Sequence, residues 1–588
     1  MERTDYCGTL RAADAGREVN LCGWVQRRRD HGGLIFVDLR DREGLVQVVF
    51  SPEKGQEMFA AAERLRGEYV LQTKGLVRLR PEGSDNENLP TGEVEVVAKE
   101  LTILNPAKTP PFYIEDEVNV DELMRLKYRY LDLRRPEMQQ ALCLRHKVSQ
   151  AIRRFLDEEG FYEIETPILC KSSPEGARDF LVPSRVHSGE FYALPQSPQL
   201  FKQLLMVSGM DRYFQIARCF RDEDLRADRQ PEFTQLDMEM SFIGEDDVMD
   251  LTERMLGYVF EQSLGRKLKL PFIHLTHKEA ISRFGSDKPD LRFGMELIDI
   301  AEIAKESEFK VFALIAQKGG WVRGINAKGC GHYSRKDMDD LTKFAAVFGA
   351  KGLAYMIVEE GGLRSPISKF FTEQQLQAIC RCMEAEPGDL LMFVADNPAV
   401  CAESLGRLRE EIALRENLAN TDELNFVWVT DFPLLEYSQE ERRWTAVHHP
   451  FTAPKEEDMP LLDAEPGKVR ARAYDVILNG VELGGGSVRI HDRAVQEQMF
   501  SLLGLSKEES RDKFGYLLEA FEYGTPPHGG IAFGLDRMLM LMSKKPSIRD
   551  VIAFPKTQSA SDMMIQSPSA VTDKQLQELS ILLDDPRR

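Results

Sequence analysis

The stretch CFRDEDLRADRQPEFTQ, residues 219–235, is the part of the sequence that indicates the fold most directly. It places arginines among acidic residues between two apolar runs, which indicates a charged loop that joins two strands. Arg221 and Glu223 are two residues apart, so they would point to one face of a strand that continued through them. A guanidinium there can meet a phosphate while the carboxylate accepts from an amine or a ribose. A surface loop laced with ion pairs is the alternative interpretation.

A second polar cluster, residues 475–489, combines two carboxylates, three consecutive glycines and an arginine. The carboxylates Asp475 and Glu482 could hold Mg²⁺ together with a phosphate, because Mg²⁺ keeps some of its waters and seldom has an all-protein cage. The glycines allow the backbone to approach a ligand closely. A glycine-rich hairpin without a ligand explains the same residues equally well.

A third cluster, GGIAFGLDR at residues 529–537, runs into the apolar stretch 538–542. Small residues at a strand-to-helix junction that ends in an arginine suit a nucleotide lying across the backbone. Alone, this pattern is a weak indication. No GxxxxGK[ST] is present, and no GxGxxG follows a strand, so the sequence offers neither a P-loop nor a dinucleotide fingerprint.

Residues 1–105 have the pattern of a small all-β domain, with five apolar or period-2 runs and a helical stretch between the third and the fourth. This layout is typical of an OB barrel, a fold that commonly binds single-stranded nucleic acid. The arginine run 27–29, close to Phe36, suits such binding, although a solvated charge run on a turn is the alternative. The runs are 19–26, 34–38, 45–50, 69–79 and 93–104, and the helical stretch is 54–66.

The composition excludes several classes of protein. The chain has 588 residues, is 43% hydrophobic and 29% charged, and has a formal net charge of −20, so disorder, collagen and coiled coil are poor interpretations. The negative charge weighs against a surface that coats nucleic acid as a whole, but not against one local basic surface. No apolar run reaches the ~20 residues of a membrane span, and the charged N-terminus has no signal peptide, so we expect a cytoplasmic protein without a membrane partner.

The order of three motifs resembles that of the class II aminoacyl-tRNA synthetases. GFYEIETPIL at 160–169 follows a predicted helix over 136–160, FRDE stands at 220–223 and GLDR at 534–537, where this class has its motifs 1, 2 and 3. The finer resemblance is to the bacterial aspartyl-tRNA synthetases, and it covers essentially the whole chain. It is carried by PEGARD at 174–179, QSPQLFKQ at 196–203 and HHPFT at 448–452.

The resemblance implies an α+β multidomain fold: an N-terminal OB-fold β-barrel, a class II synthetase catalytic domain with an antiparallel sheet, and an inserted α/β domain. It also implies a homodimer, since in this class the helix and strand of motif 1, ending here at Pro167, build the interface between two copies. The implied boundaries are an anticodon-binding domain 1–105, a hinge 106–135, a first catalytic part with motifs 1 and 2 136–290, a bacterial-type insertion 291–420, a second catalytic part with motif 3 421–556, and a C-terminal extension 557–588.

The activity implied by the resemblance is the attachment of L-aspartate to tRNA in two steps, through aspartyl-adenylate, with release of pyrophosphate and AMP. Arg221 and Arg537 would be catalytic, acting on the α- and γ-phosphates of ATP, and Asp475 and Glu482 would hold Mg²⁺. The aspartate site would consist of Glu175, Gln199, Lys202, Arg221, Asp237, His448, His449 and Arg489. The ATP site would consist of Arg221, Asp222, Glu223, Gln230, Glu482, Gly534, Leu535, Asp536 and Arg537.

The barrel would read the anticodon of tRNA. His31 and Gly83 resemble the relaxed subgroup of the bacterial enzymes, so we expect aspartate to be attached to tRNA-Asp and also to tRNA-Asn, the second product being amidated by a tRNA-dependent amidotransferase. A strict enzyme for tRNA-Asp, with both residues as ordinary turn residues, is the alternative. The residues implied in anticodon contact and discrimination are Arg27, Arg29, His31, Phe36, Gln47, Arg78, Arg80 and Gly83.

Three other functions are compatible with parts of this sequence. An ammonia-dependent asparagine synthetase shares the catalytic fold, but the OB region argues against it because such an enzyme needs no tRNA reader. A non-catalytic RNA-binding paralogue is expected to lack a motif arginine, whereas Arg221, Arg489 and Arg537 are all present. Asparaginyl-tRNA synthetase is close within the class, and the insertion and the QSPQLFKQ string favour aspartate. The sequence indicates no role for residues 291–420.

Overall fold

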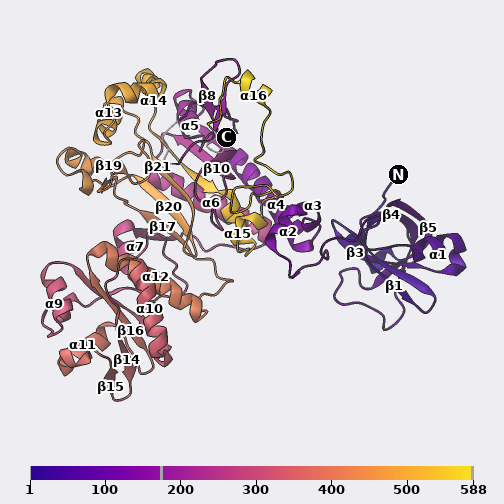
Figure 1. Cartoon of the computed structure of the whole chain (residues 1–588), viewed down its shortest axis with the longest axis horizontal. Helices are drawn as coiled ribbons and strands as arrows, with labels where there is room; N and C mark the ends of the chain where they lie inside the picture. Colours follow the sequence, from indigo (N-terminus) through magenta and orange to yellow (C-terminus); the bar gives the residue numbers. More distant parts are fainter. Residues whose placement is uncertain (1, 173–176, 585–588) are drawn as a thin grey trace. The chain divides into compact units, whose positions relative to one another are not determined.

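The computed structural model (Figure 1) describes residues 2–172 and 177–584. These residues form two compact units. Two short segments from far along the chain belong to the first unit, although their neighbours in sequence belong to the second. Within the described ranges, no helix combines the length and the apolar character of a membrane span. The first unit is Met1–His146, Leu225–Gln230 and Lys545–Thr572, and the second is Lys147–Asp224, Pro231–Lys544 and Asp573–Arg588.

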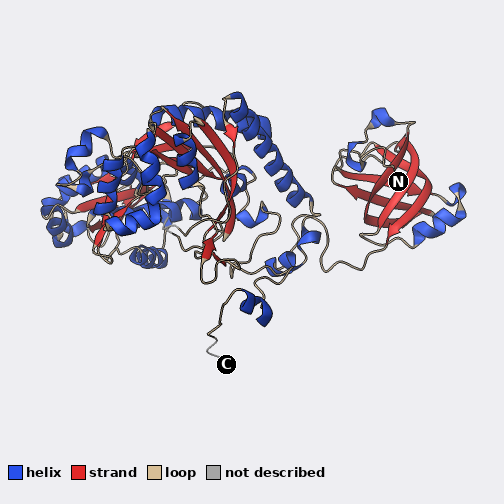
Figure 2. Ribbon diagram, turned by 90° about the horizontal axis from the view of Figure 1, so that it is seen from above, coloured by secondary structure: helices blue, strands red, loops and turns tan. Residues whose placement is uncertain are grey.

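The predicted OB barrel is confirmed by a closed barrel in the strand order β1-β2-β3-β5-β4 (Figure 2). β3 and β5 pair in parallel, and the other neighbours pair antiparallel. Period-2 alternation fills the interior, for example with Ile35, Val37 and Leu39 of β2, all fully buried. The bounds are β1 Glu18–His31, β2 Leu34–Asp41, β3 Gly44–Phe50, α1 Gln56–Glu63, β4 Val70–Leu79 and β5 Val94–Asn105.

The chain after the barrel holds two short helices, α2 (Glu122–Lys127) and α3 (Arg129–Asp132). Arg129 and Asp132 are buried and form an ion pair of 2.6 Å. The expected hinge over 106–135 therefore contains helical structure that the sequence pattern did not indicate. Each helix is too short for hydrophobic periodicity to reveal it.

The predicted helix of motif 1 is α4, Pro136–Glu158. Val148 and Ile152 lie one turn apart on its inner face and are fully buried. The helix ends just before Gly160, whose φ of +80° is a conformation that residues with a Cβ rarely adopt. The strand β6, Tyr162–Glu163, follows at the edge of the largest sheet.

An eight-stranded sheet forms the centre of the second unit, in the order β11-β17-β20-β21-β22-β10-β9-β6. Its six central strands pair antiparallel, as expected for the class II catalytic domain. The two edge pairs, β11 with β17 and β6 with β9, are parallel. The bounds are β9 Arg212–Phe220, β10 Glu232–Ser241, β11 Ile273–Thr276, β17 Phe426–Thr430, β20 Ala473–Leu478, β21 Val481–Val488 and β22 His528–Gly534.

Three helices pack near the middle of this sheet. α5 (Gln199–Val207) and α15 (Leu535–Met542) contact β10, and α6 (Glu245–Leu264) contacts β22. α15 begins directly after β22, so Gly534 stands at a strand-to-helix junction as predicted. The further elements of this unit are β7 Leu181–Pro183, β8 Phe191–Ala193, α7 His277–Phe284, β18 Leu435–Ser438, β19 Arg443–Ala446, α13 Arg493–Leu502, α14 Lys507–Ala520 and α16 Asp573–Glu578.

Residues 298–415 form a separate five-stranded antiparallel sheet with helices, in the strand order β12-β13-β16-β14-β15 (Figure 1). Leu341 of α10 and Leu405 of α12 belong to one of its hydrophobic cores, and Phe312 of α9 and Ile379 of α11 belong to the other. The bounds are β12 Ile298–Asp299, α8 Ala301–Lys305, α9 Lys310–Gln317, β13 Trp321–Ala327, α10 Arg335–Val347, β14 Ala354–Glu359, β15 Gly362–Arg364, α11 Glu373–Cys382, β16 Leu390–Asp396 and α12 Pro398–Arg415.

Candidate active site

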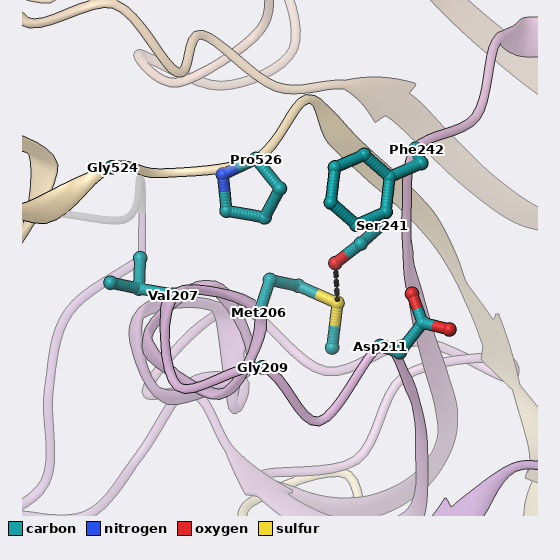
Figure 3. A pocket seen from close by; sticks show the side chains of 8 residues that line it. All are labelled: Met206, Val207, Gly209, Asp211, Ser241, Phe242, Gly524 and Pro526. Carbon is teal, nitrogen blue, oxygen red and sulfur yellow. Dashed lines mark hydrogen bonds between the residues drawn. The ribbon is translucent and has the colours of Figure 1, made fainter.

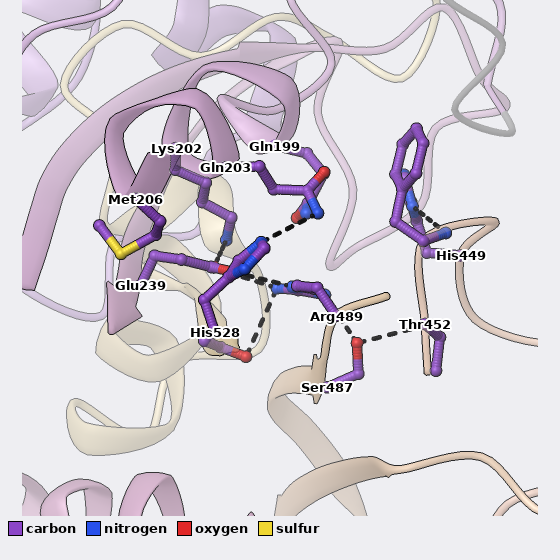
Figure 4. A network of polar contacts seen from close by, with 12 residues as sticks. Gln199, Lys202, Gln203, Met206, Glu239, His449, Thr452, Ser487, Arg489 and His528 are labelled. Atoms are coloured by element: carbon purple, nitrogen blue, oxygen red, sulfur yellow. Dashed lines mark hydrogen bonds and ion pairs between the residues drawn. The ribbon is translucent and has the colours of Figure 1, made fainter. Parts of the chain in front are cut away.

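Two buried cations and two buried carboxylates meet at the middle of the eight-stranded sheet; Figure 4 shows three of them, Lys202, Glu239 and Arg489. Lys202 comes from α5, Asp237 and Glu239 come from β10, and Arg489 directly follows β21. The Nζ of Lys202 lies 3.1 Å from Oδ1 of Asp237 and 3.3 Å from Oε2 of Glu239. Nε of Arg489 donates to Oε1 of Glu239 at 3.0 Å, and no side chain of the four is more than 6% exposed.

Glu239 was not among the predicted residues, and it changes the expected use of Arg489. Its two oxygens accept from Nε and Nη2 of Arg489, and Nη1 donates to Oγ of Ser487 at 2.8 Å. One edge of the guanidinium of Arg489, a residue implied in aspartate binding, is therefore taken by a carboxylate of the protein. A signal for Glu239 was present in the sequence, because Asp237 and Glu239 are two residues apart and so share one face of a strand.

The charges in this cluster determine the protonation of its groups. Burial alone would raise the pKa of Glu239, but Arg489 and Lys202 lower it to about 2, so this carboxylate is charged at neutral pH. Burial also raises the pKa of Asp237, and there it outweighs the attraction of Lys202. Burial, followed by the charges of Arg489 and Lys202, lowers the pKa of His449 to about 3, so this imidazole is neutral at neutral pH.

Several buried polar atoms beside this cluster have no hydrogen-bond partner among the described residues. They are Gln199 Nε2, Gln203 Oε1, Asp237 Oδ2 and His449 Nε2. An unsatisfied buried donor or acceptor costs about 1–3 kcal/mol, so such atoms often mark the place of a ligand. The acceptor on Asp237 suits an ammonium group, and the donor on Gln199 suits a carboxylate. The arrangement therefore fits an amino acid bound beside the two cations.

Gln203 and His528 form a further contact at this site that was not predicted. Nδ1 of His528 lies 2.8 Å from the carbonyl of Pro526, which can only accept, so Nδ1 carries the proton. Nε2 of the same ring then accepts from the amide of Gln203 at 3.3 Å. Both side chains are fully buried, so this bond determines how the Gln203 amide is turned.

A second cluster, on the hairpin of β20 and β21, contains the predicted metal ligands. Nε2 of His448 lies 3.4 Å from Oδ1 of Asp475, and Nζ of Lys288 lies 2.8 Å from Oε2 of Glu482. Nη1 of Arg537 donates to the backbone carbonyl of Glu482 at 2.8 Å. Burial alone would lower the pKa of His448, but the Asp475 carboxylate raises it overall. Lys288, which was not predicted, places a cation beside one of the expected metal ligands.

These residues fit a divalent cation that is shared with phosphate. Asp475 and Glu482 offer carboxylate oxygens, and hard cations such as Mg²⁺ are usually held by one or two carboxylates together with substrate phosphates. Oδ1 of Asp475 faces Nε2 of His448 at 3.4 Å and accepts no hydrogen bond of good geometry from the described residues. Within residues 2–172 and 177–584 no three His, Cys, Asp or Glu side chains form a metal cage, so phosphate or water would have to complete the coordination.

The three glycines 484–486 are required by the packing of the sheet. A Cβ on Gly484 would lie 2.6 Å from the carbonyl of Ala532, and one on Gly486 would lie 2.0 Å from that of Gly530. Strand packing therefore explains these glycines without a ligand, as the hairpin interpretation held. Gly485 has a further effect, because a Cβ there would lie 2.4 Å from Oδ1 of Asp475 and would displace that carboxylate.

The charged loop joins β9 to β10 as predicted, but its first residues do not continue the strand. β9 ends at Phe220, so the expectation that Arg221 and Glu223 share one strand face is wrong. The reason is Pro231: the N–H of Arg221 donates to its carbonyl at 2.9 Å, but proline has no N–H to return the bond. The guanidinium of Arg221 lies over the ring of Phe233, 5.2 Å from the centroid.

Two other predicted ATP contacts in this loop bind parts of the protein. Asp222 forms an isolated bridge with Arg178, whose Nε donates to its carbonyl at 3.2 Å. The side chain of Gln230 exchanges two hydrogen bonds with the backbone of Lys556, at 3.1 and 2.7 Å. Glu175, which was predicted to contact the amino acid, lies outside the described residues.

The predicted run Gly534, Leu535, Asp536 and Arg537 stands at the junction of β22 and α15. Leu535 and Asp536 are buried, and Oδ2 of Asp536 accepts from the backbone N–H of Thr234 at 2.7 Å. These residues therefore tie the start of α15 to β10. Arg537 contacts the β20–β21 hairpin instead, through the carbonyl described above.

On the barrel, three predicted tRNA contacts belong to one polar row. Arg29 Nη2 lies 2.6 Å from Oδ1 of Asp38 and donates to Oε1 of Gln47 at 3.1 Å. Nε2 of Gln47 and Nε of Arg78 donate to the two oxygens of Glu95, each at 2.7 Å. Glu95 is buried and was not predicted, yet it joins two of the predicted residues.

The other predicted tRNA contacts lie around this row. Phe36 on β2 is half-buried, and Arg27 on β1 is exposed. Nε of Arg80 donates to a backbone carbonyl of β5 at 3.1 Å. His31 is the last residue of β1, and Gly83 lies between β4 and β5 with a φ of +78°. A Cβ on Gly83 would meet nothing within 4 Å, so a side chain has room there but strains the backbone.

A separate open pocket of about 340 Å³ lies beside the end of α5 (Figure 3). In its wall, Oγ of Ser241 donates to Sδ of Met206 at 3.2 Å. No predicted substrate-binding residue with a described position lines this pocket, so we do not assign the reaction to it. Its lining consists of Met206, Val207, Gly209, Asp211, Ser241, Phe242, Gly524 and Pro526.

Comparison with known proteins identifies the family of this chain. Residues 121–558 match the family model described as tRNA synthetases class II (D, K and N), and residues 19–104 match the OB-fold nucleic acid binding domain. The "Aspartate--tRNA(Asp/Asn) ligase" of Heliobacterium modesticaldum is 65% identical over 100% of this chain and 97% of its own length. The protein of the same name from Moorella thermoacetica is 63% identical over 99% of this chain and 97% of its own length.

The fold is also seen in solved structures of low sequence identity. The asparaginyl-tRNA synthetase from Pyrococcus horikoshii complexed with asparaginyl-adenylate is 18% identical, with a TM-score of 0.61 over 95% of this chain and 98% of that chain. At this identity the likeness concerns the fold alone. The matching family model spans most of the chain, and the curated relatives span nearly all of it. The chain belongs to the class II aminoacyl-tRNA synthetases of the D, K and N group, in the family of the aspartate–tRNA(Asp/Asn) ligases.

Proposed function

We propose that the chain attaches L-aspartate to tRNA-Asp, and also to tRNA-Asn, through aspartyl-adenylate. The observation that carries this is the buried cluster of Lys202, Arg489, Asp237 and Glu239, which offers cations to a carboxylate and an anion to an ammonium group. Relatives that are 65% and 63% identical carry this activity in their names. ATP and tRNA are the other substrates, and we place the reaction in the cytoplasm, where both are found.

In this proposal the amino acid binds beside Arg489 and Lys202. Its side-chain carboxylate accepts from Nζ of Lys202 and from the second N–H of Nη1 of Arg489, since Nη2 already donates to Glu239 and to the carbonyl of Gly530. Its ammonium group donates to Asp237, whose Oδ2 has no hydrogen bond among the described residues. Nδ1 of His449 accepts from the backbone N–H of Phe451 at 3.4 Å, so Nε2 carries the proton and can donate to a carboxylate oxygen.

The nucleotide is held by arginines from two motifs. Arg221 contacts the α-phosphate and Arg537 the γ-phosphate, where their fixed charges stabilise the negative charge that develops during transfer. Asp475 and Glu482 would hold Mg²⁺, which would supply positive charge against the phosphates. Both side chains supply carboxylate oxygens, which are the ligands that Mg²⁺ prefers. Arg537 also lies beside Glu482, and this position supports the assignment.

The chemistry follows from positioning. A carboxylate oxygen of aspartate attacks the α-phosphorus in line, the bond between this phosphorus and the pyrophosphate oxygen breaks, and pyrophosphate leaves. A terminal ribose hydroxyl of tRNA then attacks the activated carbonyl, and AMP leaves. No side chain forms a covalent intermediate, so orientation and electrostatic stabilisation carry the catalysis.

The parts of the chain take separate roles in this proposal. The barrel within residues 1–105 reads the anticodon, and the match of residues 19–104 to the OB-fold nucleic acid binding domain supports this. Residues 136–290 and 421–556 form the catalytic domain with motifs 1 to 3. The chemistry of the site gives residues 291–420 no role.

Arg489→Leu should reduce aspartate activation by about 100-fold or more, because it removes the substrate's cation and leaves Glu239 buried without its main partner. Arg537→Ala should instead raise the KM for ATP, with the KM for aspartate changed less. Aspartate-dependent ATP–pyrophosphate exchange measures both effects. Normal exchange by the first variant, or a selective loss of aspartate binding by the second, would contradict these assignments.

Glu239→Gln should raise the KM for aspartate at least about tenfold and leave the KM for ATP nearly unchanged, because Arg489 loses the charged half of a bidentate pair. Since the pKa of Glu239 is about 2, the carboxylate stays ionised as pH rises from there. The ratio of the KM for aspartate of the Glu239→Gln variant to that of the unaltered enzyme should therefore be constant between about pH 6 and pH 9.

The matched control for this change is Glu253→Gln. Glu253 is also buried, but it accepts from the N–H of Phe272 and from Nε1 of Trp428, and neither partner belongs to the cluster. Its replacement should leave the KM for aspartate unchanged. Equal effects of both substitutions on this KM would show that Glu239 has no specific role.

We further propose a homodimer formed through α4 and the chain around β6. Tyr162 is 64% exposed, Ile168 42% and Leu169 52%, so large apolar side chains gather along this short stretch. Such groups are suited to burial against a second copy, and two-fold dimers are the commonest soluble assembly.

Sedimentation should give a particle of twice the 67.0 kDa of the chain, and Ile168→Asp should shift it toward the monomer. A stable, fully active monomer would contradict the dimer.

We propose that the barrel accepts the anticodons of both tRNA-Asp and tRNA-Asn, which differ at one base. With no side chain at Gly83, the loop between β4 and β5 lacks a group that would reject a wrong base, and such repulsive groups often provide specificity. A tRNA-dependent amidotransferase would then convert the aspartyl-tRNA-Asn. The alternative is a strict tRNA-Asp enzyme in which His31 and Gly83 are turn residues.

Charging of purified tRNA-Asp and tRNA-Asn side by side decides between these two. The unaltered enzyme should aspartylate both, and His31→Leu combined with Gly83→Lys should shift the preference toward tRNA-Asp by about tenfold. Gly16→Lys is the matched control, since Gly16 also has a positive φ, +90°, and open space around an added Cβ. It should leave the preference unchanged. No useful aspartylation of tRNA-Asn by the unaltered enzyme would rule out the relaxed enzyme.

A further inference from the structure

Arg129 is a buried arginine that takes no part in the proposed reaction. It lies in α3, and its side chain is 3% exposed. Nε donates to the carbonyl of Ala553 at 2.9 Å, and Nη2 donates to those of Arg549 and Ile552 at 2.6 and 2.8 Å. Nη1 pairs with Asp132 at 2.6 Å. One guanidinium thus binds three carbonyls of a segment that lies 420 to 424 residues further along the chain.

The segment held by this guanidinium also holds the tip of the charged loop. Oγ of Ser547 and the N–H of Ile548 both donate to the carbonyl of Ala227 at 3.0 Å. Further along, the backbone of Lys556 forms the pair of hydrogen bonds with the side chain of Gln230. Gln230, one of the predicted ATP contacts, is 4% exposed. The loop tip is therefore bound to this segment at two points.

The stretch that carries α3 is also tied to the barrel. Arg134, two residues after α3, donates to Oε2 of Glu68 at 2.7 Å, and Glu68 receives two further bonds from Arg40 of β2, at 2.9 and 2.7 Å. The guanidinium of Arg134 also lies over the ring of Trp24, 5.1 Å from its centroid. Arg40 and Glu68 are buried, so this is not an exposed surface pair of small effect.

We propose that Arg129 is a positioning residue for ATP binding. It holds the carbonyls of Arg549, Ile552 and Ala553, and the segment that carries them holds the tip of the loop that begins at Arg221 and ends at Gln230. A planar guanidinium with five donors can bind several carbonyls at once, whereas the single ammonium of a lysine cannot reproduce that geometry. The inference rests on the proposed function only in taking this loop as the one that binds ATP.

The stretch around α3 contacts both the barrel and the segment that holds the loop tip. Arg134 binds Glu68 of the barrel unit, and Arg129 binds the 547–556 segment. All of these residues belong to the first of the two compact units. A displacement of this stretch would therefore reach the barrel and the loop together.

Arg129→Lys is the informative substitution, because it keeps the positive charge beside Asp132 and removes the fork. In aspartate-dependent pyrophosphate exchange, the KM for ATP should rise about tenfold, and the KM for aspartate should change less than about twofold. Since KM does not depend on the fraction of folded enzyme, a partial loss of folding does not produce this pattern. An unchanged KM for ATP would overturn the proposal.

The matched control is Arg125→Lys. Arg125 lies in α2, 3.9 Å from the same Asp132, and among the described residues the side-chain hydrogen bonds to the carbonyls of this segment come from Arg129 and Arg145 and not from Arg125. This variant should keep both KM values.

Ser547→Ala removes one bond to Ala227 and should raise the KM for ATP, as Arg129→Lys does. In the double variant the two effects should not add. Fully additive effects would contradict a shared route.

Hydrogen–deuterium exchange of the full, substrate-free chain supplies a readout that does not depend on the reaction. The peptide that covers residues 225–230 should exchange about threefold faster or more after Arg129→Lys, and at the unaltered rate after Arg125→Lys. Unchanged protection in the first variant, or equal loss in both, would overturn the proposal. An unaltered enzyme without aspartate-dependent exchange activity would instead contradict the proposed function, and the protection of 225–230 would still decide the role of Arg129.

Discussion

Arg489 and Glu239 form a buried ion pair between segments that are 250 residues apart in sequence. Buried charges are tolerated only when they are paired and hydrogen-bonded, so this pair and the neighbouring Lys202 and Asp237 have to be built as one unit. The sheet makes room for it at Gly530, where a Cβ would lie 2.2 Å from Oε2 of Glu239. The buried charges can therefore be accommodated only if the central strands keep their order and glycine stands between them. The proposed amino acid site depends on this requirement.

Much of the architecture could be predicted because it follows from local patterns. Period-2 alternation indicates strands wherever one face is buried, and this condition holds throughout the barrel. The motifs placed Lys202, Asp237 and Arg489 in one site, and the structure brings these three side chains together.

The residues that escaped prediction are partners in long-range contacts. Lys288 meets Glu482, and Glu95 meets Gln47, across separations that no local pattern encodes. The spacing of Glu239 from Asp237 indicated that the two share one strand face, but no local pattern indicated that Arg489 is the partner of Glu239. The end of β9 was predicted incorrectly for a different reason: the consequence of Pro231 appears only when the partner strand is known, because the missing N–H belongs to β10's side of the ladder.

The strands on either side of the inserted module, β11 and β17, are neighbours and run in parallel. A parallel pair cannot be joined by a tight hairpin and needs a crossover of about a dozen residues or more. The chain between β11 and β17 contains α7 and the whole five-stranded module, so the module enlarges a crossover that the sheet needs in any case. The length of this crossover can change without altering how β10 and β21 pair with β22. The geometry of the charge cluster therefore does not depend on the size of the module.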